Sequence, residues 1–181
     1  MSKHIKLVLL ILAALLTITA CGNNGGNSSS SSALPLNIGE GIYTKATVKI
    51  SLSGALPAGS SISGLSFTLF YPSFLTPDMS NGTAAAGVVA PSGVISNGSQ
   101  LDPVITPPAT AASYGKILVT MADMSQSGLT QVGEVAQITL RIANGITPTK
   151  NSFILSTNGV FDLNGNTLPA MNAVVSDISL Q

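Results

Sequence analysis

The segment DLNGN, which begins at Asp162, carries oxygen-bearing side chains at alternate positions. Asp162, Asn164 and Asn166 match the first, third and fifth ligand positions of an EF-hand calcium loop. The match ends there, because the sixth position lacks the required Gly and the twelfth lacks an acid. Asn164-Gly165 is instead a strong hairpin signal, since both residues tolerate the positive φ of a type I′ turn. The segment is predicted to be a turn between strands, with a weak cation site at Asp162 and Asn166 as the alternative.

Other groups that support catalysis are scarce. The single histidine, His4, lies in the first twenty residues, so the rest of the chain has no imidazole for general-base catalysis or zinc binding. The run Gly59–Gly64, with the sequence GSSISG, approaches the serine-hydrolase elbow. Its second glycine stands one residue too far from Ser61, and no histidine can activate that serine. We therefore predict a loop here.

Carboxylates are the remaining groups that could cleave a glycosidic bond. Two of them would have to converge across a cleft, one as the acid and one as the base or nucleophile. No motif marks such a pair among the candidates, which are Asp78, Asp102, Asp123, Glu134, Asp162 and Asp177. A carboxylate-only hydrolase is thus a remote alternative. We expect a protein that is not an enzyme and that uses no metal or cofactor.

The elements that would position these residues follow an N-terminal targeting sequence. Residues 1–20 have the features of a removable secretory signal, namely the basic Lys3 and Lys6 followed by the apolar run Leu7–Leu16. That run is too short to span a membrane as a helix. The chain's only cysteine, Cys21, directly follows Ile18-Thr19-Ala20, a sequence that resembles the lipobox of bacterial lipoproteins.

The lipobox resemblance implies cleavage before Cys21, a diacylglycerol on its thiol and a further acyl chain on its new amine. Two or more chains make membrane attachment effectively stable. Gly22, in place of Asp, is compatible with export to the outer membrane of a Gram-negative cell. The alternative is an ordinary secretory signal that happens to carry a cysteine.

Residues 21–33, with the sequence CGNNGGNSSSSSA, are predicted to be a flexible tether, because they offer no apolar residue to bury in a core. As a random coil the tether would span about 20 Å, which keeps the domain close to the membrane. Residues 34–181 form one domain that is long enough to fold without disulfides. From Cys21 onward, five basic and seven acidic residues give a net charge of −2 without runs, so we exclude nucleic acid as a partner.

The predicted domain is all-β. Apolar and polar residues alternate with period two in several stretches, and no stretch has a helical period. The expected strands are Ala46–Leu52, Leu65–Tyr71, Lys116–Met121, Ala136–Ile142, Ser152–Leu155 and Val174–Leu180. Each has one polar face, which favours a sandwich of two antiparallel sheets, with a closed barrel as the weaker alternative.

Sugar-binding modules usually present a strip of exposed aromatic rings, and this chain has no Trp. Tyr71 is in phase with Leu65, Phe67 and Leu69 and is predicted to lie in the core or to anchor a strand end. Phe70 has the opposite phase. On an open outward face it would be an interaction hot spot, but burial under a second face or a loop is the preferred interpretation.

The order of these features resembles that of the cohesin domain, the dockerin receptor of cellulosomes. The matching stretches are ATVKISLSG (46–54), ISGLSFTLFYPSFL (62–75), GKILVTMAD (115–123), SGLTQVGEVAQITLRI (127–142) and GVFDLNGNTLPAM (159–171). The second stretch departs from the cohesin pattern, which has an Asp after the tyrosine that corresponds to Tyr71. The resemblance implies a jelly-roll sandwich, a fold that cohesins share with several carbohydrate-binding modules.

The cohesin resemblance also implies a function. It indicates a non-catalytic module, anchored in the cell envelope, that binds another protein through one sheet face, with a dockerin-like or envelope protein as the partner. A polysaccharide is the alternative partner. The resemblance carries no contact residue onto this sequence, so the binding surface is left unassigned.

Overall fold

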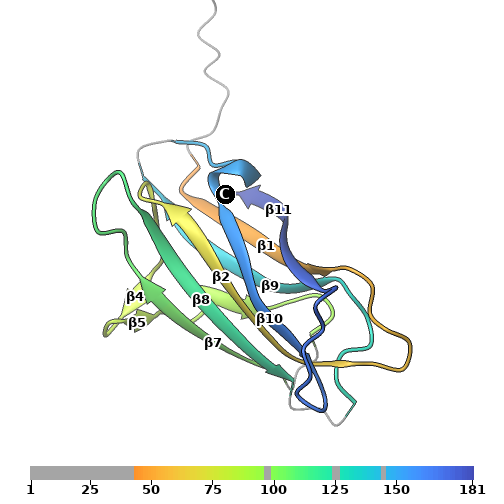
Figure 1. The fold of residues 1–181 in the computed structure, drawn as a ribbon. Coiled ribbons are helices and arrows are strands. Elements are labelled where there is room, and N and C mark those ends of the chain that lie inside the picture. The colour runs from red at the N-terminus through yellow and green to blue at the C-terminus, as the bar shows by residue number, and fades with distance from the viewer. Residues whose placement is uncertain (1–42, 96–98, 124–126, 144–145) are drawn as a thin grey trace, which may run out of the picture. The chain divides into compact units, whose positions relative to one another are not determined.

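The structure is a computed structural model that describes residues 43–95, 99–123, 127–143 and 146–181 (Figure 1). The chain divides between Glu40 and Gly41, and the described residues all belong to the unit Gly41–Gln181. The predicted signal peptide, Cys21, the tether and residues 34–42 lie outside the described residues. The described part contains no helix with the length and hydropathy that crossing a membrane requires.

The described part is built almost entirely from β-strands, with a single short 3₁₀ helix, η1 (Lys150–Ser152). The strands are β1 (Lys45–Ser53), β2 (Ile62–Pro72), β3 (Leu75–Thr76), β4 (Met79–Ser80), β5 (Thr83–Ala84), β6 (Val89–Pro91), β7 (Ser99–Thr106), β8 (Tyr114–Asp123), β9 (Glu134–Ile142), β10 (Ile154–Asp162) and β11 (Asn172–Leu180).

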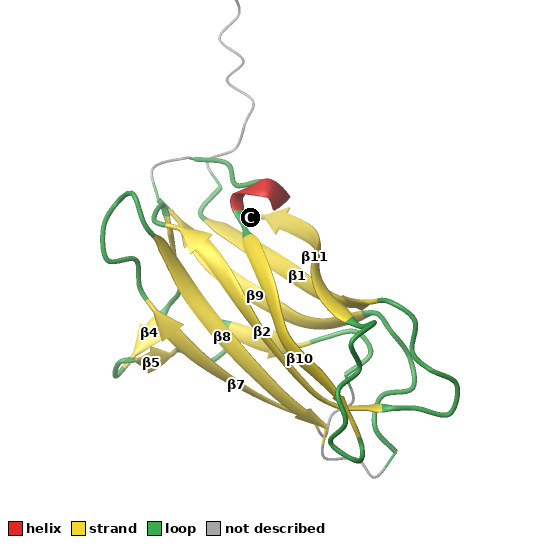
Figure 2. Cartoon of the chain, in the orientation of Figure 1, coloured by secondary structure: helices red, strands yellow, loops and turns green. Residues whose placement is uncertain are grey.

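The strands form two layers (Figure 2). Sheet A has the order β11-β1-β9, and β3 and β6 pair at separate positions along the other side of β9. Sheet B has the order β10-β2-β8-β7, and β4 and β5 form a small hairpin of their own. Neighbouring strands are antiparallel throughout both sheets. The predicted all-β sandwich of two antiparallel sheets is confirmed.

The core lies between the sheets and consists of the inward residues of each alternating strand. Val48 and Ile50 from β1 face Phe67 and Leu69 from β2, and all four are fully buried. The stretches predicted as strands from their period of two do form β1, β2, β8, β9 and β11. Burial of one face is what fixes the register, because a slip of one residue would expose every one of these side chains.

The prediction of a strand at Ser152–Leu155 is wrong at its start. Ser152 ends η1, where its hydroxyl accepts the backbone N–H of Thr149 at 3.0 Å and favours a tight turn. The strand β10 begins at Ile154 and continues to Asp162, through a bulge between Thr157 and Gly159. The strand β7 was missed in the sequence because it contains Pro103, and it lies at the edge of sheet B, where a proline is tolerated.

Candidate functional site

The outer face of sheet B is the surface that best fits a binding site. In β2 the side chains of Phe67, Leu69 and Tyr71 are fully buried. Because successive residues of a strand point to opposite faces, Thr68 and Phe70 must lie on the outside of the sheet. The packing of the core therefore determines which residues this face presents.

Strand pairing gathers apolar residues at one end of the outer face. Phe70 pairs with Ile154 of β10 on one side and with Lys116 of β8 on the other. Two residues further along β8, on the same face as Lys116, Leu118 pairs with Val104 of β7. At the strand end, Tyr114 lies beside Pro72. We call this surface the apolar strip and define it as Phe70, Val104, Tyr114, Leu118 and Ile154.

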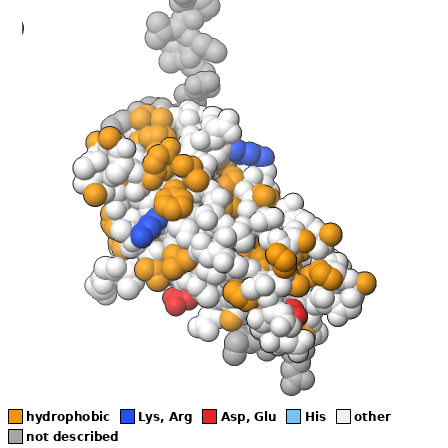
Figure 3. All heavy atoms as spheres, viewed as in Figure 1, with side chains coloured by type: hydrophobic (Ala, Val, Ile, Leu, Met, Phe, Trp, Pro, Cys, Tyr) orange, Lys and Arg blue, Asp and Glu red, His pale blue; other side chains and the backbone are white. Residues whose placement is uncertain are grey.

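The apolar strip is open to solvent in the described part of the chain. Val104 is 56%, Ile154 is 54% and Tyr114 is 48% exposed, while Phe70 and Leu118 are half-buried. Figure 3 shows hydrophobic side chains gathered beside a basic one on the face that sheet B turns to the viewer. Contiguous exposed apolar patches on soluble proteins often mark sites of interaction.

Two charged residues lie on the same face as the apolar strip. Lys116 lies among the strip residues, between Phe70 and Thr106 in the strand register. Four residues further along β8, Thr120 pairs with Asp102. Gln100, Asp102 and Thr120 line an open hollow of about 200 Å³. The cation and the acid are thus separated by about 14 Å along the strand direction, with Leu118 and Val104 between them.

The interpretation that places Tyr71 in the core is confirmed, whereas Phe70 matches neither the buried nor the fully exposed alternative. Phe70 is only half-buried on the outer face, and Tyr71 has no exposed surface. Burial raises the pKa of the Tyr71 hydroxyl. The ring fits because Gly115 lies opposite, where a Cβ would stand only 2.3 Å from Tyr71 Cζ. This close approach fixes β8 so that Tyr114 and Lys116 point outward.

Four residues of the strip received no role in the sequence reasoning: Val104, Tyr114, Leu118 and Ile154. A signal was present for Leu118, which has the opposite phase to Ile117 and Val119 within a correctly predicted strand. Ile154 follows the buried Phe153 in the same way. What the sequence does not contain is the strand order that places these residues next to Phe70.

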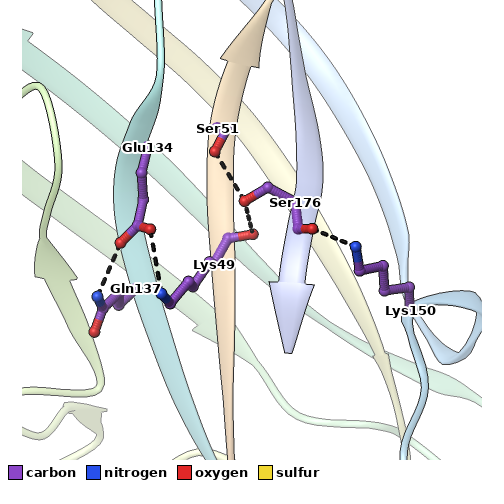
Figure 4. A network of polar contacts seen from close by, with 6 residues as sticks. All are labelled: Lys49, Ser51, Glu134, Gln137, Lys150 and Ser176. Atoms are coloured by element: carbon purple, nitrogen blue, oxygen red, sulfur yellow. Dashed lines mark hydrogen bonds and ion pairs between the residues drawn. The ribbon is translucent and has the colours of Figure 1, made fainter. Parts of the chain in front are cut away.

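The outer face of sheet A is occupied by polar side chains that bind one another (Figure 4). Lys49 of β1 forms an ion pair with Glu134 of β9, with a distance of 3.6 Å between Nζ and Oε2. Gln137 donates a hydrogen bond of 2.8 Å from Nε2 to the other carboxylate oxygen of Glu134. The Ser92 hydroxyl and the Gln137 amide, followed by the charge of Lys49, lower the pKa of Glu134 against the opposing effect of its partial burial.

A second polar group closes the edge of sheet A. The register between β1 and β11 shifts at Ser176, whose hydroxyl donates to the Lys49 carbonyl at 3.2 Å and accepts from the Ser51 hydroxyl at 2.8 Å. Lys150 donates a hydrogen bond from Nζ to the Ser176 carbonyl (Figure 4). A bulge and a lysine at an edge strand both hinder pairing with a further strand.

The predicted turn at DLNGN is confirmed, but its predicted type is wrong. Gly165 has a φ of 79°, and Asn164 is not among the described residues with positive φ. The Gly165 N–H donates to the Asp162 carbonyl at 3.0 Å. The Asp162 carboxylate accepts the N–H groups of Asn164 and Asn166, each at 2.8 Å. These bonds hold a longer loop, with only the glycine in the left-handed region, instead of a two-residue type I′ turn.

A weak cation site at Asp162 and Asn166 was the alternative predicted for the same loop, and it stays a prediction. Both oxygens of Asp162 already accept hydrogen bonds, because Oδ2 accepts the side-chain amide of Asn166 at 3.1 Å. That bond, together with the backbone bonds from Asn166 and Asn164, lowers the pKa of Asp162. The described residues hold no group of three or more His, Cys, Asp or Glu that could bind a metal ion.

The carboxylates considered for glycoside cleavage are distributed over both sheets and their loops. Asp78 forms an ion pair with Arg141, Glu134 binds Lys49, and Asp162 closes its turn. Asp102 lies on β7, Asp177 on β11, and the buried Asp123 ends β8. The loop predicted at Gly59–Gly64 is confirmed for Gly59–Ser61 and wrong for the last three residues, because β2 begins at Ile62.

Comparisons of the chain with models of protein families, with curated proteins and with solved structures find no match. The two outer faces of the sandwich differ in what they present to solvent. On sheet A the polar groups satisfy one another, and on sheet B apolar side chains are left exposed.

Proposed function

We propose that this protein is a non-catalytic recognition module that binds another protein through the outer face of sheet B. The observation that carries the proposal is the apolar strip, which lies on a regular sheet face and is exposed to solvent. Protein interfaces have an apolar, aromatic-rich centre with a polar rim, and a few residues at that centre supply most of the affinity. Phe70 and Tyr114 are the aromatic candidates for that centre.

The side chains of the apolar strip indicate which surface a partner would need. An apolar surface would cover Phe70, Leu118 and Val104, with an acidic group near Lys116 and a basic group near Asp102. Complementary charges at two fixed points select the orientation of a partner more than they add affinity. The resemblance to cohesins, which bind dockerins through one sheet face, supports a protein as the partner.

The proposal includes attachment to the cell envelope through lipid on Cys21, in the outer membrane if the cell is Gram-negative. Its support is the sequence of residues 1–21 alone. Intact-mass analysis of the protein from its native membrane should show a lipidated Cys21. A Cys21→Ser protein should leave the membrane fraction, and one that stayed there would contradict the anchor.

The binding face is tested by capture with matched variants. Immobilised protein is exposed to the envelope and secreted fractions of the producing cell, and bound proteins are identified. We expect a partner that the wild type retains, that a Phe70→Ser/Ile154→Ser double variant loses, and that a Val174→Ser variant on the outer face of sheet A retains. Equal capture by all three proteins, or no capture by the wild type, would overturn the proposal.

Polysaccharide binding is the second candidate function. One observation favours it: the exposed Tyr114 ring lies on the same face as the polar hollow of Gln100, Asp102 and Thr120. An aromatic face can stack on one sugar of a chain while the polar groups, about 20 Å away along β8, bind the hydroxyls of another. Signals on a glycan array that disappear in Tyr114→Ala, with no protein captured, would favour this function over protein recognition.

A further inference from the structure

The hairpin between β4 and β5 turns at Asn81-Gly82 with an unusual backbone. Asn81 has a φ of 52° and Gly82 a φ of 82°, which are the two positive values that a type I′ turn requires. Asn81 is the one described residue other than glycine with a positive φ. Both residues are exposed, and within the described part of the chain the Gly82 N–H donates no hydrogen bond.

We propose that Asn81 is a site of spontaneous deamidation, the preferred one among the described Asn-Gly pairs. The Gly82 nitrogen attacks Cγ of Asn81 and loses its proton to solvent base. A bond from that nitrogen to Cγ forms, the bond from Cγ to Nδ2 breaks, and ammonia leaves with a proton from water. Water then opens the resulting succinimide at either carbonyl, which gives aspartate or isoaspartate.

Three properties make Asn81 suited to this reaction. Gly82 has no side chain to block the attack, and nothing lies within 4 Å of the position of its absent Cβ. Its N–H is not tied up by an acceptor. The strands of the hairpin pair at only two positions, Met79 with Ala84 and Ser80 with Thr83, and one further backbone bond joins the Ala85 N–H to the Asp78 carbonyl at 2.9 Å. So short a ladder opens easily, and opening lets the backbone rotate toward the geometry of the cyclic intermediate.

Two further Asn-Gly pairs in the described part lack the combination of a free N–H and a short hairpin, although the space around Gly165 is equally open, and they serve as internal controls. In Asn164-Gly165 the attacking N–H is bound to the Asp162 carbonyl at 3.0 Å. Asn158-Gly159 lies within β10, where the Asn158 amide donates to the Thr68 hydroxyl at 3.0 Å. A free nucleophile is thus combined with a weak hairpin only at Asn81.

The modification would change the charge of the loop. A new carboxylate at residue 81 would lie in the hairpin next to Asp78, which pairs with Arg141 of sheet A. Isoaspartate would also lengthen the backbone within the tightest part of the turn. The protein would therefore accumulate a more acidic form with time, faster at higher pH because the attacking nitrogen must lose a proton.

The test is a time course on the mature protein at mildly alkaline pH, followed by peptide mapping with mass spectrometry. Asn81 should convert severalfold faster than Asn164 and Asn158, and the product should include isoaspartate. In denaturant the three rates should converge, because all three sites then share the same unstructured Asn-Gly sequence. Conversion at Asn164 or Asn158 that matched or exceeded conversion at Asn81 in the folded protein would overturn the proposal.

A variant tests whether the carboxylate bonds that order the loop also protect Asn164, while the backbone carbonyl that accepts the Gly165 N–H is kept. Asp162→Ala removes the carboxylate that accepts the N–H groups of Asn164 and Asn166. Conversion at Asn164 should rise by about threefold to tenfold, the range expected when one or two ordinary hydrogen bonds are lost, while Asn81 is unaffected. An unchanged rate at Asn164 would show that local hydrogen bonding does not set the order of the sites.

Discussion

The two outer faces of the sandwich are built on the same alternation of residues and yet differ in how their side chains are used. On sheet A, Lys49 and Gln137 both bind Glu134, and the Ser176 hydroxyl binds two residues of the neighbouring strand β1. On sheet B, Phe70 pairs with Ile154 and Leu118 pairs with Val104, and no layer covers them in the described part of the chain. A face whose groups satisfy one another contributes to stability, whereas a face left apolar and open is suited to a partner.

The largest expected effect is a difference in stability between substitutions on the inner and the outer face of sheet B. Phe67→Ala should lower the free energy of unfolding by about 3–5 kcal/mol, because it opens a cavity in the core. Phe70→Ala, on the same strand, should cost only about 1 kcal/mol, since its ring is half-buried. Denaturant unfolding measures both values. If the two costs were equal, Phe70 would be a structural residue and the strip would lose its main candidate.

The next effect compares valines on the two outer faces. Val104 of sheet B is 56% and Val174 of sheet A is 39% exposed. Val104→Glu should weaken partner binding at least about tenfold, because it introduces a charge at the centre of an apolar contact. Val174→Glu should leave affinity unchanged. Affinity measured by calorimetry with the captured partner decides between them, and a loss with Val174→Glu would move the site to sheet A.

A smaller effect tests whether the polar group on sheet A stabilises the fold. The pKa of Glu134 is lowered in the folded protein, so its stabilisation is present above the ordinary Glu value of about 4.3 and is lost as the pH falls through the lower folded value. Glu134→Gln should therefore be less stable than the wild type at pH 7, by up to about 1 kcal/mol. Once the pH is below the lowered folded pKa of Glu134, the difference should vanish. A difference that persisted in acid would rule out the charge as its source.

The smallest effect compares two lysines on outer faces. Lys49→Ala removes the ion pair with Glu134 and should cost up to about 1 kcal/mol, with less cost at high salt. Lys116→Ala, within the strip, should change stability by no more than about 0.5 kcal/mol. Thermal unfolding of the two variants gives the comparison. A clear destabilisation by Lys116→Ala would mean that sheet B also depends on its surface charges.

Much of the fold could be predicted because burial leaves a pattern in the sequence. The strands at Ala46–Leu52 and Leu65–Tyr71 alternate strictly, and each one has a fully buried face. The strand β7 could not be predicted as easily, because Pro103 is tolerated only where an edge leaves its missing N–H without consequence. The start of β10 was misplaced because the hydroxyl of Ser152 favours a turn that propensity alone does not show.

The three described Asn-Gly pairs show how much of the backbone conformation the local sequence can predict. The type I′ turn predicted for Asn164-Gly165 occurs instead at Asn81-Gly82. At Asn164 the carboxylate of Asp162 captures two backbone N–H groups and favours a longer loop. Asn158-Gly159 forms no turn, because it lies in the middle of a long strand. The Asn-Gly dipeptide permits a turn, and the surrounding residues determine whether a turn forms and of which type.

The sequence by itself determined the all-β class, the strands with a buried face and the scarcity of catalytic groups, because each of these depends on residue type and short-range periodicity. It also placed Phe70 out of phase with the core. Only the tertiary structure decided that Phe70 lies between Ile154 and Lys116 on an open face, since those neighbours come from strands more than forty residues away. Strand order depends on how all the apolar faces pack together, and no local pattern contains that information.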